Sequence, residues 1–258
     1  MTRKRPTFFK KNNLNNYLMI TDSGGATDQI KRSMYDRSFE TLWNSGSETS
    51  GSSTIQIDFE TAVLLDAIAL QQCNFKTFTI TYNAGSQFST PISISNNITN
   101  KHFYFEFNQV SVTSILITIT DTIVSSTQRT LGELLLLTKV FSMSENTSDQ
   151  INVPVDDKVV IVKLSDNTTF KNYLRSVINY DIKVGYVDQT ELENYKAIYE
   201  INKREPFIFM RNPDTVAWDG EANHYNWCNG FDFYNFSQDF YVNGYSGNIR
   251  LAQACGVL

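Results

Sequence analysis

Thr54-Ile55-Gln56-Ile57-Asp58-Phe59 is the stretch that decides the fold, because apolar and polar residues alternate along it. A period of two places Ile55, Ile57 and Phe59 on one face and indicates a half-buried strand. Further short strands are predicted over Leu64–Gln71, Phe75–Tyr82, His102–Phe107, Val112–Thr120 and Leu131–Val140. Polar turns separate these strands and no helical pattern lies between them, so the sequence predicts an antiparallel β-sandwich.

The composition supports a mainly β protein. Aromatic residues make up 13% of the 258 residues and charged residues only 19%, and aromatic and β-branched residues suit pleated, half-buried surfaces. The net charge of −5 makes a nucleic-acid partner unlikely. No apolar run approaches the ~20 residues that cross a bilayer, and Asn12, Asn13, Asn15 and Asn16 interrupt any signal-peptide core.

The chain divides into four segments. Residues 1–16, with five Lys and Arg in the first eleven, are expected to be a basic flexible arm. Residues 17–141 form the predicted sandwich, and the polar stretch 142–152 is the predicted linker. Residues 153–258 form a smaller α+β domain with one main helix over 188–202, for which Thr190 is the expected N-cap and Glu193 its capping-box partner.

The first domain resembles the discoidin, or coagulation factor 5/8 type C, family. In that family a D-x-x-x-x-T-x-W loop precedes an I-x-(I/L)-D-(F/L) strand, and Asp36–Ser45 and Ile55–Phe59 match both. Leu65–Leu70 and Phe78–Tyr82 match the next two strands in order and spacing, and later elements follow at Ile115–Ile119 and Glu133–Leu136. The resemblance implies an eight-stranded galactose-binding-like jelly roll.

The resemblance also implies two kinds of ligand. Such domains often bind glycans through loops at one end, where Gln87, Phe88 and Arg129 are the candidate ligand-binding side chains. They often hold a structural calcium, for which Asp36, Asp22 and Asp28 are the candidate oxygen ligands. The alternative is that Asp36 caps a turn through its side chain. No other cofactor is expected.

The second domain carries a dense aromatic segment over 218–245. Aromatic residues are enriched at the centres of interfaces, so the candidate interface residues are Trp218, Tyr225, Trp227, Phe231 and Tyr234. Core packing explains the same density. This half also weakly resembles phage tail and baseplate structural proteins, which implies partners among other virion proteins and a homo-oligomeric ring.

Catalysis is not expected. Cys73, Cys228 and Cys255 form neither a disulfide framework nor, with His102 and His224, a zinc site. A nucleophilic couple of Cys228 and His224 is conceivable, but no nucleophile motif surrounds it. The carboxylate pairs in the sequence do not show the convergence in a cleft that a glycosidase needs.

The sequence therefore predicts a non-enzymatic virion structural protein of a phage or phage-like particle, a tail, tail-tip or baseplate component assembled in the host cytoplasm. In this reading the second domain docks into a ring and the jelly roll faces outward. The alternative is a carbohydrate-binding module of a cell-surface or secreted system, with a glycan as its partner.

Overall fold

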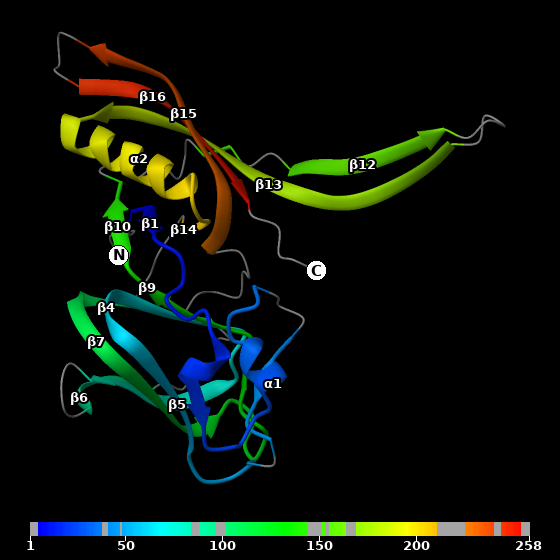
Figure 1. Ribbon diagram of the computed structural model, residues 1–258, viewed down its shortest axis with the longest axis vertical. Helices are drawn as coiled ribbons and strands as arrows, with labels where there is room; N and C mark the ends of the chain where they lie inside the picture. The colour runs from blue at the N-terminus through cyan, green and yellow to red at the C-terminus, as the bar shows by residue number, and fades with distance from the viewer. Residues whose placement is uncertain are drawn as a thin grey trace. The chain divides into compact units, whose positions relative to one another are not determined.

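The computed structural model describes residues 5–37, 41–46, 48–83, 88–95, 102–143, 151–152, 155–163, 169–210, 225–239 and 244–253. The chain forms two compact units (Figure 1). The sandwich unit is centred on Phe9–Lys139, and the mixed unit combines the N-terminal residues up to Phe8 with residues from Val140 onward. Both units are built from antiparallel strands, and the predicted fold class, mainly β with a sandwich followed by an α+β domain, is confirmed. No helix in the described ranges is long and apolar enough to cross a membrane.

The sandwich unit contains a large sheet, a small sheet and two short helices. The large sheet has the order β2 (Ile20–Asp22), β4 (Ser53–Gln71), β7 (Phe103–Thr122), β5 (Phe75–Asn83), β6 (Phe88–Ser95), and β9 (Glu133–Leu137) also pairs with β4. The small sheet pairs β3 (Trp43–Asn44) with β8 (Thr130–Leu131). The helices are η1 (Tyr17–Met19) and α1 (Asp28–Arg32).

Strand β4 joins two stretches that the sequence predicts as separate strands, an alternating one around Ile55–Phe59 and a continuously apolar one over Leu64–Gln71. Its first half alternates between buried and more exposed residues, with Ile55 and Ile57 buried opposite Ile117 and Ile115 of β7. Every residue from Leu65 to Gln71 is buried, as expected for a strand that is covered on both faces. The period-two pattern therefore supplies one wall of the core, which also contains Trp43.

A wide irregularity interrupts β4 in its middle. Asp58 pairs with Ser114 of β7 and Val63 pairs with Val112. The four β4 residues 59–62 thus lie opposite the single β7 residue 113, which makes a bulge. A bulge takes residues out of the ladder and redirects the strand, and here it leaves Glu60 and Thr61 exposed.

The N-terminal segment differs from the predicted flexible arm. Residues Thr7–Phe9 form β1 in the sheet of the mixed unit. The segment Lys10–Asn13 lies along the free edge of β9, where the backbone amides of Lys10 and Asn13 donate to the carbonyl oxygens of Thr138 and Leu136 at 2.9 and 3.0 Å. An unpaired strand edge exposes a row of hydrogen-bond donors and acceptors. The asparagine-rich segment, which the sequence suggested was flexible, pairs with such an edge on β9.

The mixed unit contains one sheet and one main helix. Its strands are β10 (Lys139–Ser142), β1, β14 (Phe207–Met210), β15 (Tyr225–Asp239), β16 (Gly244–Gln253), β13 (Thr169–Val187) and β11 (Ile151–Asn152), in that order, and β12 (Val155–Lys163) also pairs with β13. The core is aromatic, with Phe8 stacked on Phe141 at 5.0 Å between ring centroids and Tyr195 edge-on to both.

The helix α2 spans Gln189–Asn202, close to the predicted range, but its N-cap lies two residues before the expected Thr190. Asp188 is its N-cap, because the Asp188 carboxylate accepts a hydrogen bond from the amide of Glu191 at 2.7 Å. The expected capping box of Thr190 and Glu193 is therefore wrong, since Asp188 already satisfies a free amide of the first turn. In the sequence, the sandwich unit ends at Lys139 and the mixed unit resumes at Val140. Strands β10 and β11 occupy parts of the expected linker.

The candidate interface residues lie partly within the described ranges. Tyr225, Trp227, Phe231 and Tyr234 belong to β15, which is hydrogen-bonded to β14 on one side and β16 on the other. Trp218, like His224, lies outside the described residues. The interface stays a prediction.

Candidate functional site

The loop at the β3–β8 end of the sandwich was the expected ligand-binding region. Arg129 is only 2% exposed there. Its guanidinium donates to the carbonyl oxygens of Glu48, at 2.9 Å, and Gly51, at 2.5 Å. Its backbone amide donates to the Ser45 hydroxyl at 3.0 Å. Arg129 therefore holds the loop around residues 45–51 from inside and does not present its charge to a ligand.

The structure does not test a binding role for the other two predicted ligand-binding residues, Gln87 and Phe88. Gln87 lies outside the described residues. Phe88 is the first residue of β6, and its backbone pairs with Asn83 of β5. A binding role for these two residues stays a prediction.

The candidate calcium ligands have local hydrogen-bonding roles. One carboxylate oxygen of Asp22 accepts from the amide of Ala26 at 3.0 Å, and Asp36 accepts from the Thr41 hydroxyl at 2.6 Å. Asp28 lies in the first turn of α1. In the part of the chain that the structure describes, no three Asp, Glu, His or Cys side chains gather closely enough to hold a metal ion. A calcium bound through these residues stays a prediction.

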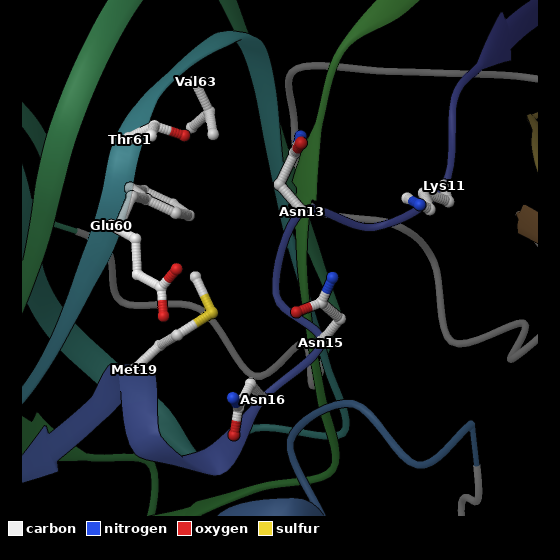
Figure 2. A pocket seen from close by; sticks show the side chains of 9 residues that line it. Lys11, Asn13, Asn15, Asn16, Met19, Glu60, Thr61 and Val63 are labelled. Carbon is white, nitrogen blue, oxygen red and sulfur yellow. The ribbon is translucent and has the colours of Figure 1, made fainter.

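A polar cleft with a volume of about 330 Å³ lies elsewhere on the sandwich unit (Figure 2). One wall is the N-terminal segment, which contributes Lys11, Asn13, Asn15 and Asn16. This wall has a fixed backbone because Lys10–Asn13 is hydrogen-bonded to β9 and because the Asn16 side chain caps η1 by accepting from the amide of Leu18 at 3.0 Å.

The opposite wall is the bulge of β4. It contributes Glu60, Thr61 and Val63, and the apolar side chains of Met19 and Phe59 complete the lining. Figure 2 shows two facing rows, with the asparagines on one side and the β4 residues on the other. Without the bulge Glu60 and Thr61 would stay in the ladder with β7, as Val63 does, so the register shift creates this wall.

A chain of hydrogen bonds connects the two walls. The Asn13 amide donates to the Thr138 hydroxyl at 3.1 Å, and that hydroxyl donates to the carbonyl oxygen of Leu64, next to Val63, at 2.5 Å. The Asn13 amide also donates to the carbonyl oxygen of Leu136 at 2.9 Å. Asn13 therefore fixes the width of the cleft at this end.

Asn12 anchors the same segment from behind. Its side chain is 4% exposed, and it donates to the carbonyl oxygen of Leu134 at 2.7 Å while accepting from the amide of Leu136 at 2.8 Å. Its carboxamide thus pairs with β9 as a peptide group of a neighbouring strand would. The anchored segment thereby places the side chains of Asn15 and Asn16 at the cleft.

Three polar side chains of the cleft have no partner in the part of the chain that the structure describes. Asn15, Glu60 and Thr61 form no hydrogen bond or ion pair among the described residues. Asn15 and Glu60 extend into the space between the rows (Figure 2). An amide both donates and accepts, and a carboxylate accepts, so the cleft offers complementary groups to a ligand that is rich in hydroxyls.

Burial shifts the pKa of two groups on the large sheet, Asp66 of β4 and Tyr104 of β7. Asp66 accepts from the backbone amide of Lys139 at 2.7 Å and from the Gln109 side chain at 3.2 Å. Burial nevertheless raises the pKa of Asp66 above its ordinary value. Burial and the nearby carboxylates of Glu106 and Asp66 also raise the pKa of Tyr104. Neither Asp66 nor Tyr104 lines the cleft.

The cleft residues were not identified from the sequence. The run of asparagines was interpreted as part of a flexible arm, and Glu60 was not singled out. The usable signal was the polar run Glu60–Thr61 between two apolar stretches of what proves to be one strand, which marks a bulge. Nothing local in the sequence shows that Asn15 and Glu60 face one cleft.

Comparisons with known proteins identify structural neighbours only. No protein-family model matches the chain, and no curated protein matches it. A chitosan-binding module from a Paenibacillus sp. IK-5 chitosanase/glucanase is 14% identical, with a TM-score of 0.41 over 50% of this chain and 99% of the module. A Clostridium perfringens module solved with GalNAc-β-1,3-galactose is 13% identical, with a TM-score of 0.40 over 46% and 94%. A Streptococcus pneumoniae fucose-binding module is 11% identical, with a TM-score of 0.37 over 46% and 89%.

These comparisons correct the main functional prediction. The similar structures are carbohydrate-binding modules and not tail or baseplate proteins. The interpretation as a virion structural protein is therefore wrong; it rested on the weak resemblance of the second domain to tail and baseplate proteins and on the missing signal-peptide pattern.

Proposed function

We propose that the sandwich unit is a non-catalytic carbohydrate-binding module whose ligand lies in the cleft between residues 11–19 and 59–63. The observation that carries this proposal is the set of unpartnered polar side chains, Asn15, Glu60 and Thr61, facing each other across a preformed cleft. Small-ligand sites are typically preformed hollows with a few well-placed polar groups.

The chemistry of the lining favours a sugar over other small ligands. Adjacent hydroxyls of a sugar can donate to the Glu60 carboxylate and exchange hydrogen bonds with the Asn15 amide. The thioether of Met19 and the Val63 side chain supply apolar contact for the C–H face of a ring. One basic residue, Lys11, and one acidic residue, Glu60, line the cleft, so it has no excess charge to select an ionic ligand.

The non-catalytic role follows from the same lining. Glycoside hydrolysis generally uses two carboxyl groups about 5–10 Å apart. Among the described residues that line the cleft, Glu60 is the only carboxylate. The cleft is thus equipped to hold a sugar and not to cleave it.

The test is isothermal titration calorimetry of the full-length protein with neutral mono- and oligosaccharides. We expect micromolar-to-millimolar binding that falls about tenfold in Glu60→Gln, because a hydrogen bond to a charged group contributes about 1.5–3 kcal/mol. Asn15→Ala should weaken binding less. Asn108→Ala, an exposed asparagine on β7, is the matched control and should bind like the original protein. Equal affinity in all four proteins would refute a site in this cleft.

A further inference from the structure

The shape of the cleft carries an inference about the length of its ligand, and this inference rests on the proposed function. We infer that the cleft binds at least two consecutive units of a neutral glycan chain, rather than a single terminal sugar.

The two walls run side by side over a similar length. The asparagine wall extends from Asn13 to Asn16 and the β4 wall from Glu60 to Val63. Three steps of extended chain at about 3.3 Å per residue span roughly 10 Å, which exceeds the length of one sugar ring. Asn16 has an extended backbone, with φ −144° and ψ 130°, and residues 60–63 lie within β4, so roughly 10 Å is the greatest length that either wall can reach.

The polar and apolar groups are distributed along this length. At one end Glu60, Asn16 and Met19 lie close together, and at the other end Thr61 and Val63 face Asn13 (Figure 2). Each end therefore combines an apolar side chain with hydrogen-bonding groups. We call the first the Glu60 end and the second the Thr61 end.

The two ends differ in the strength of their polar groups. The Glu60 end has a carboxylate without a partner, and hydrogen bonds to charged groups are stronger than those between neutral groups. At the Thr61 end the Asn13 amide nitrogen already donates to Leu136 and Thr138, and the groups with no hydrogen bond among the described residues are neutral, such as the Thr61 hydroxyl. The first sugar therefore binds at the Glu60 end, and a second adds affinity at the Thr61 end.

The experiment uses oligosaccharide series of one to six units, built on glucose, mannose, xylose and galactose, with the full-length protein. For the series that binds, we expect the affinity to rise at least tenfold from one unit to two or three and then to level off. Thr61→Arg, which places a bulky side chain at an exposed position, should remove this gain, so that its affinity no longer rises with the length of the chain. Thr61→Ser, which keeps the hydroxyl, is the control and should keep the gain.

The outcomes separate this inference from the proposed function. Equal affinity for one unit and for longer chains, with Glu60→Gln weakening both, would overturn the two-unit site and leave carbohydrate binding in place. An unchanged gain with chain length in Thr61→Arg would also overturn the assignment of the second unit. Absence of binding across every series would overturn the proposed function and this inference together.

Discussion

The carboxamide of Asn12 offers a quantitative test of how the cleft wall is held. It makes three hydrogen bonds to backbone groups: to the carbonyl oxygen of Leu134 at 2.7 Å, from the amide of Leu136 at 2.8 Å and from the amide of Leu14 at 3.2 Å. Each buried hydrogen bond contributes about 0.5–1.5 kcal/mol net. Replacing Asn12 by the similarly sized Leu should therefore lower the free energy of unfolding of the sandwich unit by about 3 kcal/mol.

Asn12→Asp separates the donor from the acceptor. At neutral pH its carboxylate still accepts from Leu136 and Leu14 but faces the carbonyl oxygen of Leu134 without a proton. Burial raises the pKa of such a carboxyl in the folded state above its unfolded value. Stability of this variant should then increase as the pH falls through the raised pKa, because the protonated group donates to Leu134. Asn12→Leu should show no such increase beyond that of the original protein.

The assay is urea unfolding followed by the fluorescence of Trp43, which is fully buried in the sandwich core. Trp218→Phe and Trp227→Phe in every protein make Trp43 the only tryptophan. With a slope of about 2 kcal/mol/M, a loss of 3 kcal/mol lowers the midpoint by about 1.5 M. A decrease below about 0.5 M for Asn12→Leu, together with a pH-independent Asn12→Asp, would refute the role of Asn12.

Three other predictions concern buried groups. Arg129→Met should lower the melting temperature by about 5–10 °C, since two loop carbonyls lose a charged donor, and an unchanged value would contradict its role in the loop. Because burial raises the pKa of Asp66, the original protein should lose stability relative to Asp66→Asn as the pH rises from below 3.8 through that raised pKa; a flat difference in urea unfolding would exclude this. Burial raises the pKa of Cys73 to about 12, so in a Cys228→Ser, Cys255→Ser background iodoacetamide should label Cys73 only after denaturation. Rapid labelling of the folded protein would contradict its burial.

The sandwich was predictable because its core strands follow a period of two. Ile55, Ile57 and Phe59 are buried as the alternation requires, and Trp43 is fully buried. The continuous run Leu64–Gln71 was expected to be covered on both faces, and all of it except the half-exposed Leu64 is buried. Such patterns are local, so one strand at a time is enough to detect them.

The cleft was not predictable, because it depends on contacts between distant segments. Asn12 and Asn13 bond to residues 122–125 positions away in the chain. Their polarity alone is equally typical of a disordered terminus. The bulge in β4 depends on the register against β7, which no single stretch of sequence reveals.

Arg129 shows the opposite error. An arginine in a polar loop at the end of a sandwich is expected to be exposed. It is buried because the carbonyl oxygens of Glu48 and Gly51 converge on its guanidinium. A residue chosen as a ligand contact thus proves to be part of the loop's own structure.

The most direct test of carbohydrate binding in this cleft is an NMR titration of the isotope-labelled full-length protein with the glycan that binds best. The predicted result is a set of amide and side-chain shifts confined to residues 11–19 and 59–63, including the Asn15 side-chain amide, which in Glu60→Gln require about tenfold more glycan. Shifts confined to the loops over residues 45–53 and 122–130 would place the sugar at the end of the sandwich and contradict the account.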